Sequence, residues 1–541
     1  MDSLKTYIKS NLGEVINMSY KVLIPTAGTG SRLGGMTKYI NKSLVSLGNR
    51  PAISRIIESF PEDTEFVIPT GYKGELVKEY LSLAYPERKI QFVDVLLYEG
   101  TGSGLGLTIL SAKEFLQEPF VFCSCDTLVN ERIPTPDFNW MGFDHRDNRE
   151  QYRTIHVNMD SMVETIDEKG MDKGEEAQPY IGLAGIHDYR LFWKTMEEGG
   201  GEAIIQGESY GLRALIKSGI KAEKFTWFDT GVKVELEATR KRFEKPGDPN
   251  ILEKSNEAIW LLDNKVIKFS DDTRFISDRV KRAQLLKGFV PPVTGNTTHM
   301  YCYDYVKGDV LSKCISIPLF DELLEFSKKF WNGKKIDKKR QEEFKSQCMD
   351  FYRKKTYDRV EMFYKRFEKT DNADVINGVT YPKLAEILNS LDWNYIADGM
   401  PGQFHGDYHF ENILYDKSSK QFELLDWRQN FGNFLEIGDV YYDMAKLNHG
   451  LIMSHELVAK DMFTASWEDN VVKFDFARKQ SLVECERHYY QWLEKNGYDV
   501  KKVKIMTALI FLNICALHDY PYVILLYGVG KQMLYDAIYK D

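Results

Sequence analysis

A run of short apolar strands separated by helical segments constrains the fold of the first half of the chain most strongly. The segment KVLIPTA at residues 21–27 predicts a buried strand that leads into a glycine-rich turn. EFVIPT, QFVDVLL and FVFCSCD predict further buried strands, and AISRIIESF and GLGLTILSAKEFLQ show helical spacing between them. Because strands that alternate with helices usually form parallel sheets, this half is expected to be an α/β domain with a mainly parallel sheet.

The rest of the chain predicts a second architecture. With 541 residues the chain exceeds a single core, so we expect about two to four domains. The charged, turn-rich EKPGDPN marks a boundary, after which EAIWLLDNKVIKFS predicts a β-hairpin that turns at Asp263–Asn264. A helix (FISDRVKRAQLL), a strand (HMYCYDYVKG) and mostly helical sequence follow. We therefore expect an extension at 1–19, a first domain at 20–245, a small lobe at 246–310 and a larger lobe at 311–541.

The bulk composition narrows the range of partners. The net charge of −9 argues against a general nucleic-acid or anionic-membrane binder. The seven cysteines are scattered, without zinc-finger spacing, which indicates reduced thiols. The first residues lack an apolar signal core, and no stretch reaches the roughly 18 apolar residues of a membrane span. We expect a cytoplasmic protein without membrane insertion, and the sequence leaves its oligomeric state open.

The motif HGDYHFEN at residues 405–412 carries the residue types of phosphoryl transfer. It places Asn412 five residues after Asp407, and the apolar run FELLDW delivers Asp426 shortly afterwards. Transfer from ATP needs a carboxylate near the attacking hydroxyl, oxygen ligands for Mg²⁺ and a lysine for the phosphates. Lys268, at the end of the strand NKVIKF, is the candidate lysine. His405 and His409 have metal-ligand spacing, but without a third ligand motif His405 is better explained as a structural residue of the loop.

With these motifs, residues 252–541 resemble the aminoglycoside phosphotransferase/choline kinase group of small-molecule kinases. The stretches that carry the resemblance are NKVIKF, YDYVKGDVL, HGDYHFENIL, LLDW and IGDVYYDMAKL. The resemblance implies a two-lobed, protein-kinase-like α+β fold that binds ATP and Mg²⁺. It assigns Asp407 as the catalytic base and Asn412 and Asp426 as the two magnesium ligands. It assigns Lys268 as the lysine that pairs with the ATP phosphates, and Asp304 and Val306 to the hinge beside the adenine. The acidic partner of the lysine stays open, with Asp278 as the candidate.

The glycine-rich segment AGTGSRLGGMTKYINKS at residues 27–43 is a second phosphate-binding candidate. Backbone amides around Gly28, Gly30 and Ser31 can close around a triphosphate. A glycine-rich turn by itself is common, and the dinucleotide-binding pattern is not met because Leu33 stands at the third glycine position. Arg32 and Lys42 add positive charge to the same loop, which favours nucleoside-triphosphate chemistry.

Residues 20–243 resemble the sugar-phosphate nucleotidyltransferases, which have a Rossmann-like fold. EGTGSGLGLTI, FVFCSCD, IDEKG, YIGLAGI and WFDTG match in order. The sequence departs from the family pattern at Pro25-Thr26, at NKS in place of lysine–proline and at SCD in place of glycine–aspartate, and these departures keep every charged group. The resemblance implies that Arg32 and Lys42 are the catalytic cations and that Asp126 and Asp229 bind Mg²⁺. It implies substrate contacts at Glu168, Lys169 and Gly182. It implies nucleotide contacts at Ala27, Gly28, Thr29, Gly30, Ser31 and Gly102.

Both resemblances together predict a bifunctional enzyme. One half would phosphorylate a small alcohol with ATP, and the other would couple that phosphate to a second nucleotide (CTP, UTP, GTP or dTTP) and release pyrophosphate. A sugar is the expected acceptor, in nucleotide-sugar synthesis for capsule or envelope glycans. The alternative is choline or another amino alcohol, whose ammonium group the aromatic residues of SLVECERHYYQWLEK could surround. A third hypothesis is a regulatory protein without catalysis.

Overall fold

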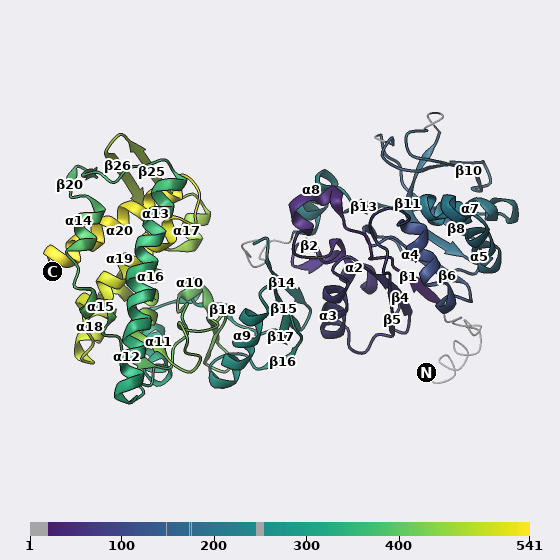
Figure 1. Cartoon of the computed structure of the whole chain (residues 1–541). Helices are drawn as coiled ribbons and strands as arrows, with labels where there is room; N and C mark the ends of the chain where they lie inside the picture. Colours follow the sequence, from purple (N-terminus) through teal and green to yellow (C-terminus); the bar gives the residue numbers. More distant parts are fainter. Residues whose placement is uncertain (1–19, 148, 172–173, 175, 245–253, 541) are drawn as a thin grey trace, which may run out of the picture. The chain divides into compact units, whose positions relative to one another are not determined.

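The computed structural model describes residues 20–147, 149–171, 174, 176–244 and 254–540 (Figure 1). The chain divides into two compact units. Unit 1 contains the described residues up to Thr273 together with Gly295–Cys302, and unit 2 contains Arg274–Thr294 and the described residues from Tyr303 onward. The predicted extension at 1–19 and the predicted boundary at 245/246 lie outside the described residues.

Unit 1 is built on a sheet whose centre is parallel. The strands β6 (Phe120–Cys123), β1 (Lys21–Leu23), β4 (Glu65–Thr70) and β5 (Ile90–Asp94) lie side by side in this order, each parallel to its neighbour. The connecting helices are α2 (Ala52–Glu58), α3 (Gly74–Ala84) and α4 (Leu105–Ser111). The prediction of an α/β domain with a parallel central sheet is therefore confirmed.

Beyond β6 the same sheet becomes mixed. Strand β11 (Gln178–Ile186) runs antiparallel to β6 and also pairs with β8 (Trp140–Phe143) and β9 (Thr154–Val157). The outer strands are β10 (Val163–Asp167) and β12 (Lys221–Lys224). Four further helices follow or separate these strands: α5 (Tyr189–Glu198), α6 (Gly200–Gln206), α7 (Glu208–Leu215) and α8 (Lys233–Phe243).

The predicted hairpin shares its core with unit 1. Strands β14 (Glu257–Leu262) and β15 (Lys265–Ser270) pair so that Asp263 and Asn264 form the turn, which confirms the prediction. They continue into a four-stranded sheet with β17 (Met300–Asp304) and β16 (Val293–Asn296). Trp260 is fully buried, and its ring contacts that of Tyr80 edge-on with 4.9 Å between centroids. The apolar faces of the hairpin and of α3 are therefore covered by each other.

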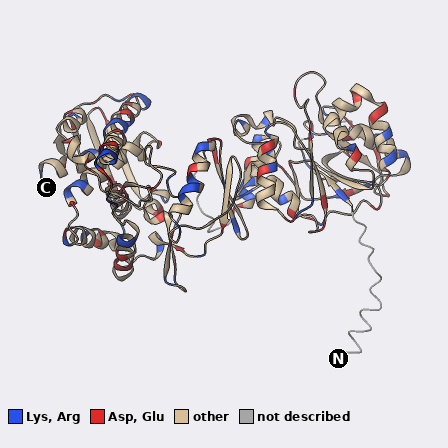
Figure 2. Ribbon diagram, turned by 60° about the horizontal axis from the view of Figure 1, so that its bottom comes forward, with Lys and Arg blue, Asp and Glu red and all other residues tan. Residues whose placement is uncertain are grey.

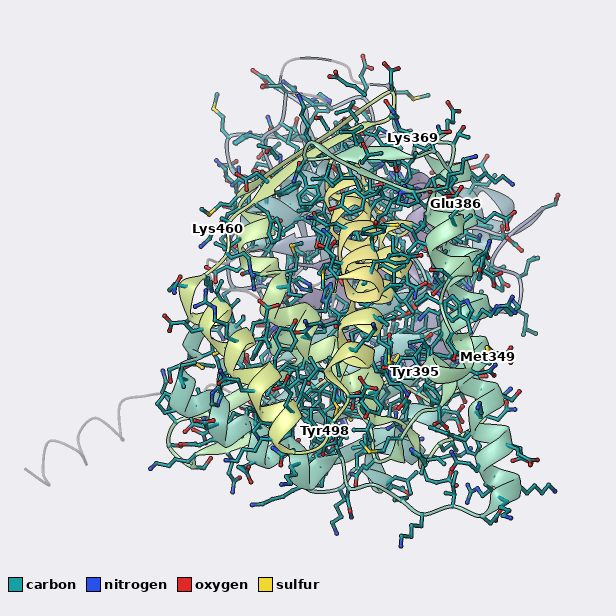
Figure 3. All side chains as sticks on the ribbon, turned by 90° about the vertical axis from the view of Figure 1, so that its left-hand side faces the viewer. Met349, Lys369, Glu386, Tyr395, Lys460 and Tyr498 are labelled. Carbon is teal, nitrogen blue, oxygen red and sulfur yellow. The ribbon has the colours of Figure 1, made fainter. Side chains whose placement is uncertain are left out.

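Unit 2 is mainly helical around two long buried helices, α19 (Val500–Cys515) and α20 (Tyr522–Tyr539). In Figure 3 the long helices run between the end of the unit that carries Lys369 and the end that carries Tyr498. Within the described part of the chain, no helix combines the length and apolar character that crossing a membrane requires. The other longer helices of unit 2 are α9 (Thr273–Leu285), α11 (Ile317–Phe330), α12 (Lys338–Met349), α13 (Lys355–Arg366), α16 (Val440–Ile452) and α18 (Gln480–Lys495), of which α13, α16 and α18 pack on α19.

One sheet of unit 2 departs from the prediction of mostly helical sequence. Strands β25 (Phe463–Glu468) and β26 (Val471–Phe476) form a hairpin, and β26 pairs in parallel with β19 (Asp374–Ile376), which pairs with β20 (Val379–Tyr381). The alternating segments FTASWE and VVKFDF, joined by Asp469–Asn470, carry the sequence signal of such a hairpin. The sheet packs on α20, since the ring of Trp467 stacks on that of Tyr527 with 4.7 Å between centroids.

The charged residues do not separate into acidic and basic regions along the helices. Figure 2 shows lysine and arginine interspersed with aspartate and glutamate on the helices of both units. Helix α12, with the sequence KKRQEEFKSQCM, is an example in which only Phe344 and Cys348 are buried. All seven cysteines are free thiols, in agreement with the expectation from their spacing.

Candidate active sites

The ends of two short strands bring Asp126 and Asp229 together in unit 1. Asp126 directly precedes β7 (Thr127–Val129), and Asp229 ends β13 (Trp227–Asp229), which pairs antiparallel with β7. A Cβ atom placed on Gly231 would lie 2.8 Å from Asp126 Oδ2 and 3.1 Å from Asp229 Oδ1. The two carboxylates therefore face one small space, which a glycine keeps open.

Two basic side chains reach the same carboxylate. Lys42 Nζ lies 3.0 Å from Asp126 Oδ2, and Arg32 Nη2 lies 3.9 Å from the same oxygen. Burial alone would raise the pKa of Asp126, but Lys42, Ser124 and Arg32 together lower it to about 2. Burial likewise opposes the charge on Lys42, and Asp126 reverses this and raises the pKa of Lys42. Both groups are therefore charged at neutral pH.

Asp229 occupies a different electrostatic environment. Its carboxylate is 5% exposed and accepts hydrogen bonds from the Tyr152 hydroxyl (2.8 Å) and the Gly231 backbone N–H (2.7 Å). Burial and the neighbouring charge of Asp126 nevertheless raise the pKa of Asp229. Two carboxylates that repel each other across a shared space are a setting that a bound cation stabilises.

The glycine-rich loop is held by the segment that supplies Lys42. Gly30 has a φ of 67°, and a Cβ there would lie 2.8 Å from Lys42 Cβ. The buried Asn41 donates from Nδ2 to the carbonyls of Thr26 (2.9 Å) and Tyr72 (2.7 Å). Its Oδ1 accepts from the N–H of Ser43 at the start of a short 3₁₀ turn. Asn41 of the NKS segment therefore holds the loop in place, and the next residue, Lys42, extends to Asp126. Ala27 is buried, Gly28 is exposed, Thr29 is half-buried and Ser31 is exposed.

The predicted substrate residues are placed with different partners. Glu168 forms ion pairs with Arg153 (2.9 Å) and Arg213 (2.5 Å). Against the effect of burial, Arg213 and Arg153 lower the pKa of Glu168. Burial, followed by the charges of Arg32 and Arg153, lowers the pKa of Lys169, which puts Lys169 in the field of the same site. The sequence analysis missed both arginine partners because nothing in their local sequence marks them.

Two predicted glycines lie in different settings. Gly182 has a φ of 73°, and its carbonyl accepts from the Ser124 N–H at 2.8 Å, so it supports the turn before Asp126. Gly102, with a φ of 86°, is exposed in the loop before α4. The glycines that follow serve packing, because a Cβ on Gly104, just before α4, would lie 2.3 Å from the carbonyl oxygen of Ile204, and one on Gly106, inside α4, would lie 1.9 Å from that of Ala203.

In unit 2 the HGDYHFEN segment folds against the turn that carries Asp426. Asn412 Nδ2 donates to the backbone carbonyl of Asp407 (3.0 Å) and to its Oδ2 (3.1 Å). The Leu425 N–H donates to the carbonyl of Asn412 (2.7 Å), and the Arg428 N–H donates to that of His405 (2.8 Å). The strands β22 (Ile413–Asp416) and β23 (Gln421–Leu424) join the two segments as an antiparallel pair. The predicted base and both predicted magnesium ligands therefore belong to one hydrogen-bonded assembly.

Helix α16 positions this loop through residues that the sequence analysis did not single out. Asp443 accepts the backbone N–H groups of His405 (2.6 Å) and Gly406 (2.7 Å). Lys446 Nζ lies 2.9 Å from Asp407 Oδ1. Both belong to IGDVYYDMAKL at helical spacing of three, so their common face was available as a signal. Burial raises the pKa of Asp443 to about 7, even though both amides oppose this.

The loop places an ionised carboxylate, Asp407, next to a neutral imidazole, His405. Burial alone would raise the pKa of Asp407, but Lys446 and His409 hold it well below its usual range. Burial lowers the pKa of His405 to about 3, so this histidine is neutral, and its Nδ1 accepts from the Asp407 N–H at 3.2 Å. An ionised Asp407 can accept a hydrogen bond from a substrate hydroxyl and orient it.

The remaining predicted residues are placed as follows. Asp426 has a φ of 58°, a conformation that aspartate tolerates better than most residues, and it forms an ion pair with Arg279. Lys268 lies on β15 and is 8% exposed. Asp304 ends β17 and is exposed, and Val306 follows it half-buried. Asp278 accepts from Asn430 Nδ2 at 3.3 Å.

The donor sets fit Mg²⁺, a hard cation that prefers oxygen ligands. Asp126 and Asp229 would hold it in unit 1, where two carboxylates share the space beside Gly231. Asn412 and Asp426 would hold it in unit 2, where backbone hydrogen bonds join the segments that carry the two residues and a bound ion would share Asp426 with Arg279. A bound magnesium ion would supply positive charge for phosphate oxygens at either place.

Comparisons with known proteins concern the N-terminal part of the chain. No family model matches the chain. The curated proteins similar to it include the "Bifunctional protein GlmU" of Methanococcus maripaludis (strain C5), 26% identical over 168 residues, and that of Methanococcus vannielii, 26% identical over 174 residues. These matches cover 30% and 31% of this chain and only 39% and 40% of the relatives, so the chain spans less than half of their length.

Similar solved structures include a UDP-glucose pyrophosphorylase complexed with UDP-glucose, with 18% identity and a TM-score of 0.36. Another is the CTP:phosphocholine cytidylyltransferase from Streptococcus pneumoniae, with 17% identity and a TM-score of 0.37. Each similarity covers 42% of this chain and, respectively, 98% and 100% of the other.

Proposed function

We propose that unit 1 is a nucleotidyltransferase that couples a phosphorylated small molecule to a nucleoside triphosphate and releases pyrophosphate. The observation that carries this proposal is the shared space of Asp126 and Asp229, with Lys42 and Arg32 at the same carboxylate. Two anionic oxygens and two cations next to a glycine-rich loop can bind a triphosphate and offset charge as pyrophosphate leaves. The similarity to curated relatives over 168 residues supports the same reading.

We further propose that unit 2 carries the catalytic residues of a small-molecule kinase. The hydrogen-bonded assembly of Asp407, Asn412 and the Asp426 turn supports it, as does the ionised state of Asp407. In this proposal Asp407 orients the hydroxyl of the acceptor, and Asn412 and Asp426 bind Mg²⁺. The hinge around Asp304 and Val306 receives the adenine.

The two proposed reactions are successive steps of one route. The kinase converts an alcohol to its phosphoester, and the transferase consumes that phosphoester to give a nucleotide-activated product. A sugar stays the leading acceptor. The aromatic argument for choline is weakened, because Tyr489 is fully buried and Trp492 is 9% exposed, with their rings stacked on each other, and only Tyr490 of this segment's tyrosine and tryptophan side chains is half-buried. An amino alcohol is therefore the second acceptor class in the test.

The decisive test combines purified full-length protein, ATP, Mg²⁺, each of CTP, UTP, GTP and dTTP, and a panel of sugars and amino alcohols. Mass spectrometry should detect a phosphoester and a nucleotide-linked product of the same acceptor. Asp407→Asn should remove phosphoester formation and leave coupling of a supplied phosphoester intact, and Asp126→Asn should give the reverse. A non-catalytic regulatory protein predicts no product with any combination.

A further inference from the structure

A group of ionisable side chains beside Asp407 is not used by either proposed reaction. His409, Glu411 and His455 each offer a ligand atom, and these atoms all lie within 4.8 Å of one another. His409 precedes the 3₁₀ turn Phe410–Asn412, which contains Glu411. His455 begins α17 (His455–Ala459), a helix that follows α16 in unit 2 (Figure 1).

The hydrogen bonding of this group is incomplete. His409 Nδ1 lies 3.4 Å from Glu411 Oε2, which is long for a hydrogen bond, and this nitrogen has no partner among the described residues. The ring of His455 lies 5.4 Å from that of His409 and 6.0 Å from that of His449. His449 is 2% exposed, and within the described ranges neither of its ring nitrogens has a hydrogen-bond partner. Buried imidazole nitrogens without partners are uncommon and call for an explanation.

We propose that His409 Nδ1, Glu411 and His455 bind a divalent transition-metal ion such as Zn²⁺. Two imidazole nitrogens and one carboxylate oxygen form a donor set that suits this class of ion, whereas Mg²⁺ favours all-oxygen sites. Three protein ligands leave a fourth position for water, and His449 stands next to the set with free nitrogens. The set shares no residue with the proposed magnesium ligands Asn412 and Asp426, but Asn412 Nδ2 lies 3.2 Å from His409 Nε2.

The metal site is connected to the proposed kinase site through the second nitrogen of one ligand. His409 Nε2 lies 3.4 Å from Asp407 Oδ2. Asn412 Nδ2 lies 3.2 Å from the same nitrogen, to which it can donate only when Nε2 carries no proton. A metal on Nδ1 fixes the tautomer of His409 with the proton on Nε2, so that Nε2–H donates to Asp407, as in carboxylate–histidine–metal arrangements. Asp407 is then less able to accept a hydrogen bond from a substrate hydroxyl. Zinc should therefore inhibit phosphoryl transfer, an effect that rests on the proposed kinase function.

Binding is tested on the chelator-treated full-length protein, without any activity measurement. Calorimetry with Zn²⁺ and visible absorption with Co²⁺, at about pH 8 so that the imidazoles can lose their protons, should show one tight equivalent. His455→Ala and, independently, Glu411→Gln should each weaken binding at least 10-fold with unchanged thermal unfolding in the absence of metal. His488→Asn is the matched control, because His488 pairs with Asp321 in the same unit outside the proposed ligand set.

Two outcomes would overturn the proposal. A protonated His409 that bridges Asp407 and Glu411 explains the cluster without metal and predicts no bound equivalent. Equal affinity in the wild type and both ligand variants would place the metal elsewhere. The coupling is read separately, as the ratio of ATP-dependent phosphorylation rates with and without Zn²⁺ within each variant. If Zn²⁺ binds and this ratio does not fall, the metal site exists but does not inhibit the kinase. If the protein has no kinase activity, the binding measurement alone decides whether the metal site exists.

Discussion

Gly28→Ala separates the requirements of the fold from those of a ligand at the glycine-rich loop. A Cβ on Gly28 would meet no atom within 4 Å, and the residue does not have a positive φ. Alanine therefore fits the folded chain, and it should stabilise unit 1 by about 0.4–1 kcal/mol by restricting the unfolded state. Nothing in the fold accounts for glycine at this position.

A bound triphosphate would account for it. If backbone amides near Gly30 and Ser31 hold phosphate oxygens, a methyl group on residue 28 stands where the phosphates approach. Losing one hydrogen bond to a charged phosphate costs about 1.5–3 kcal/mol. Since each 1.4 kcal/mol corresponds to a factor of ten, the KM for the second nucleotide should rise about 10- to 100-fold.

The assay measures pyrophosphate release against nucleotide concentration, together with thermal unfolding. Gly35→Ala is the matched control, because Gly35 also has no atom within 4 Å of its Cβ position and no positive φ. We expect the control to keep the wild-type KM, and phosphorylation of the alcohol to be equal in all three proteins. A wild-type KM in Gly28→Ala, or an equal rise in the control, would refute the assignment of this loop to the triphosphate.

Three further predictions concern unit 2. Lys446→Met removes the cation that lowers the pKa of Asp407, so the acidic limb of the pH–kcat profile of the kinase should move to higher pH; an unchanged profile would exclude Asp407 as the titrating group. Asp443 has its pKa raised to about 7, so the folded state binds its proton more tightly than the unfolded state, and the resulting stability is complete below about pH 4 and lost as the pH rises through 7. The stability difference between wild type and Asp443→Asn should therefore change by about 4 kcal/mol across this range in urea unfolding, and a constant difference would contradict the buried proton. Lys531→Met leaves Asp374 buried without its ion-pair partner and should destabilise unit 2 by about 3–5 kcal/mol in the same assay, whereas a loss below about 1 kcal/mol would show that the pair is not buried in solution.

Local patterns were sufficient to predict many elements. Strand–helix alternation predicted the parallel centre of the unit 1 sheet, and EAIWLLDNKVIKFS predicted the hairpin that turns at Asp263–Asn264. The sequence motifs also selected Asp126, Asp229 and Asp407, and the structure brings each into a group with its expected neighbours. Their chemical roles stay predictions. The missed hairpin at Phe463–Phe476 shows that alternation was overlooked in a region dominated by helical sequence.

The sequence by itself determined which segments could form strands, helices and phosphate-binding loops, because these depend on residue spacing over a few turns. Only the tertiary structure decided that Lys446 contacts Asp407, that two arginines form ion pairs with Glu168, and that the ring of His455 lies beside that of His409. These partners lie far apart along the chain or on separate elements. Their contacts depend on how the loops orient whole helices and strands against one another, and local residue spacing does not determine this orientation.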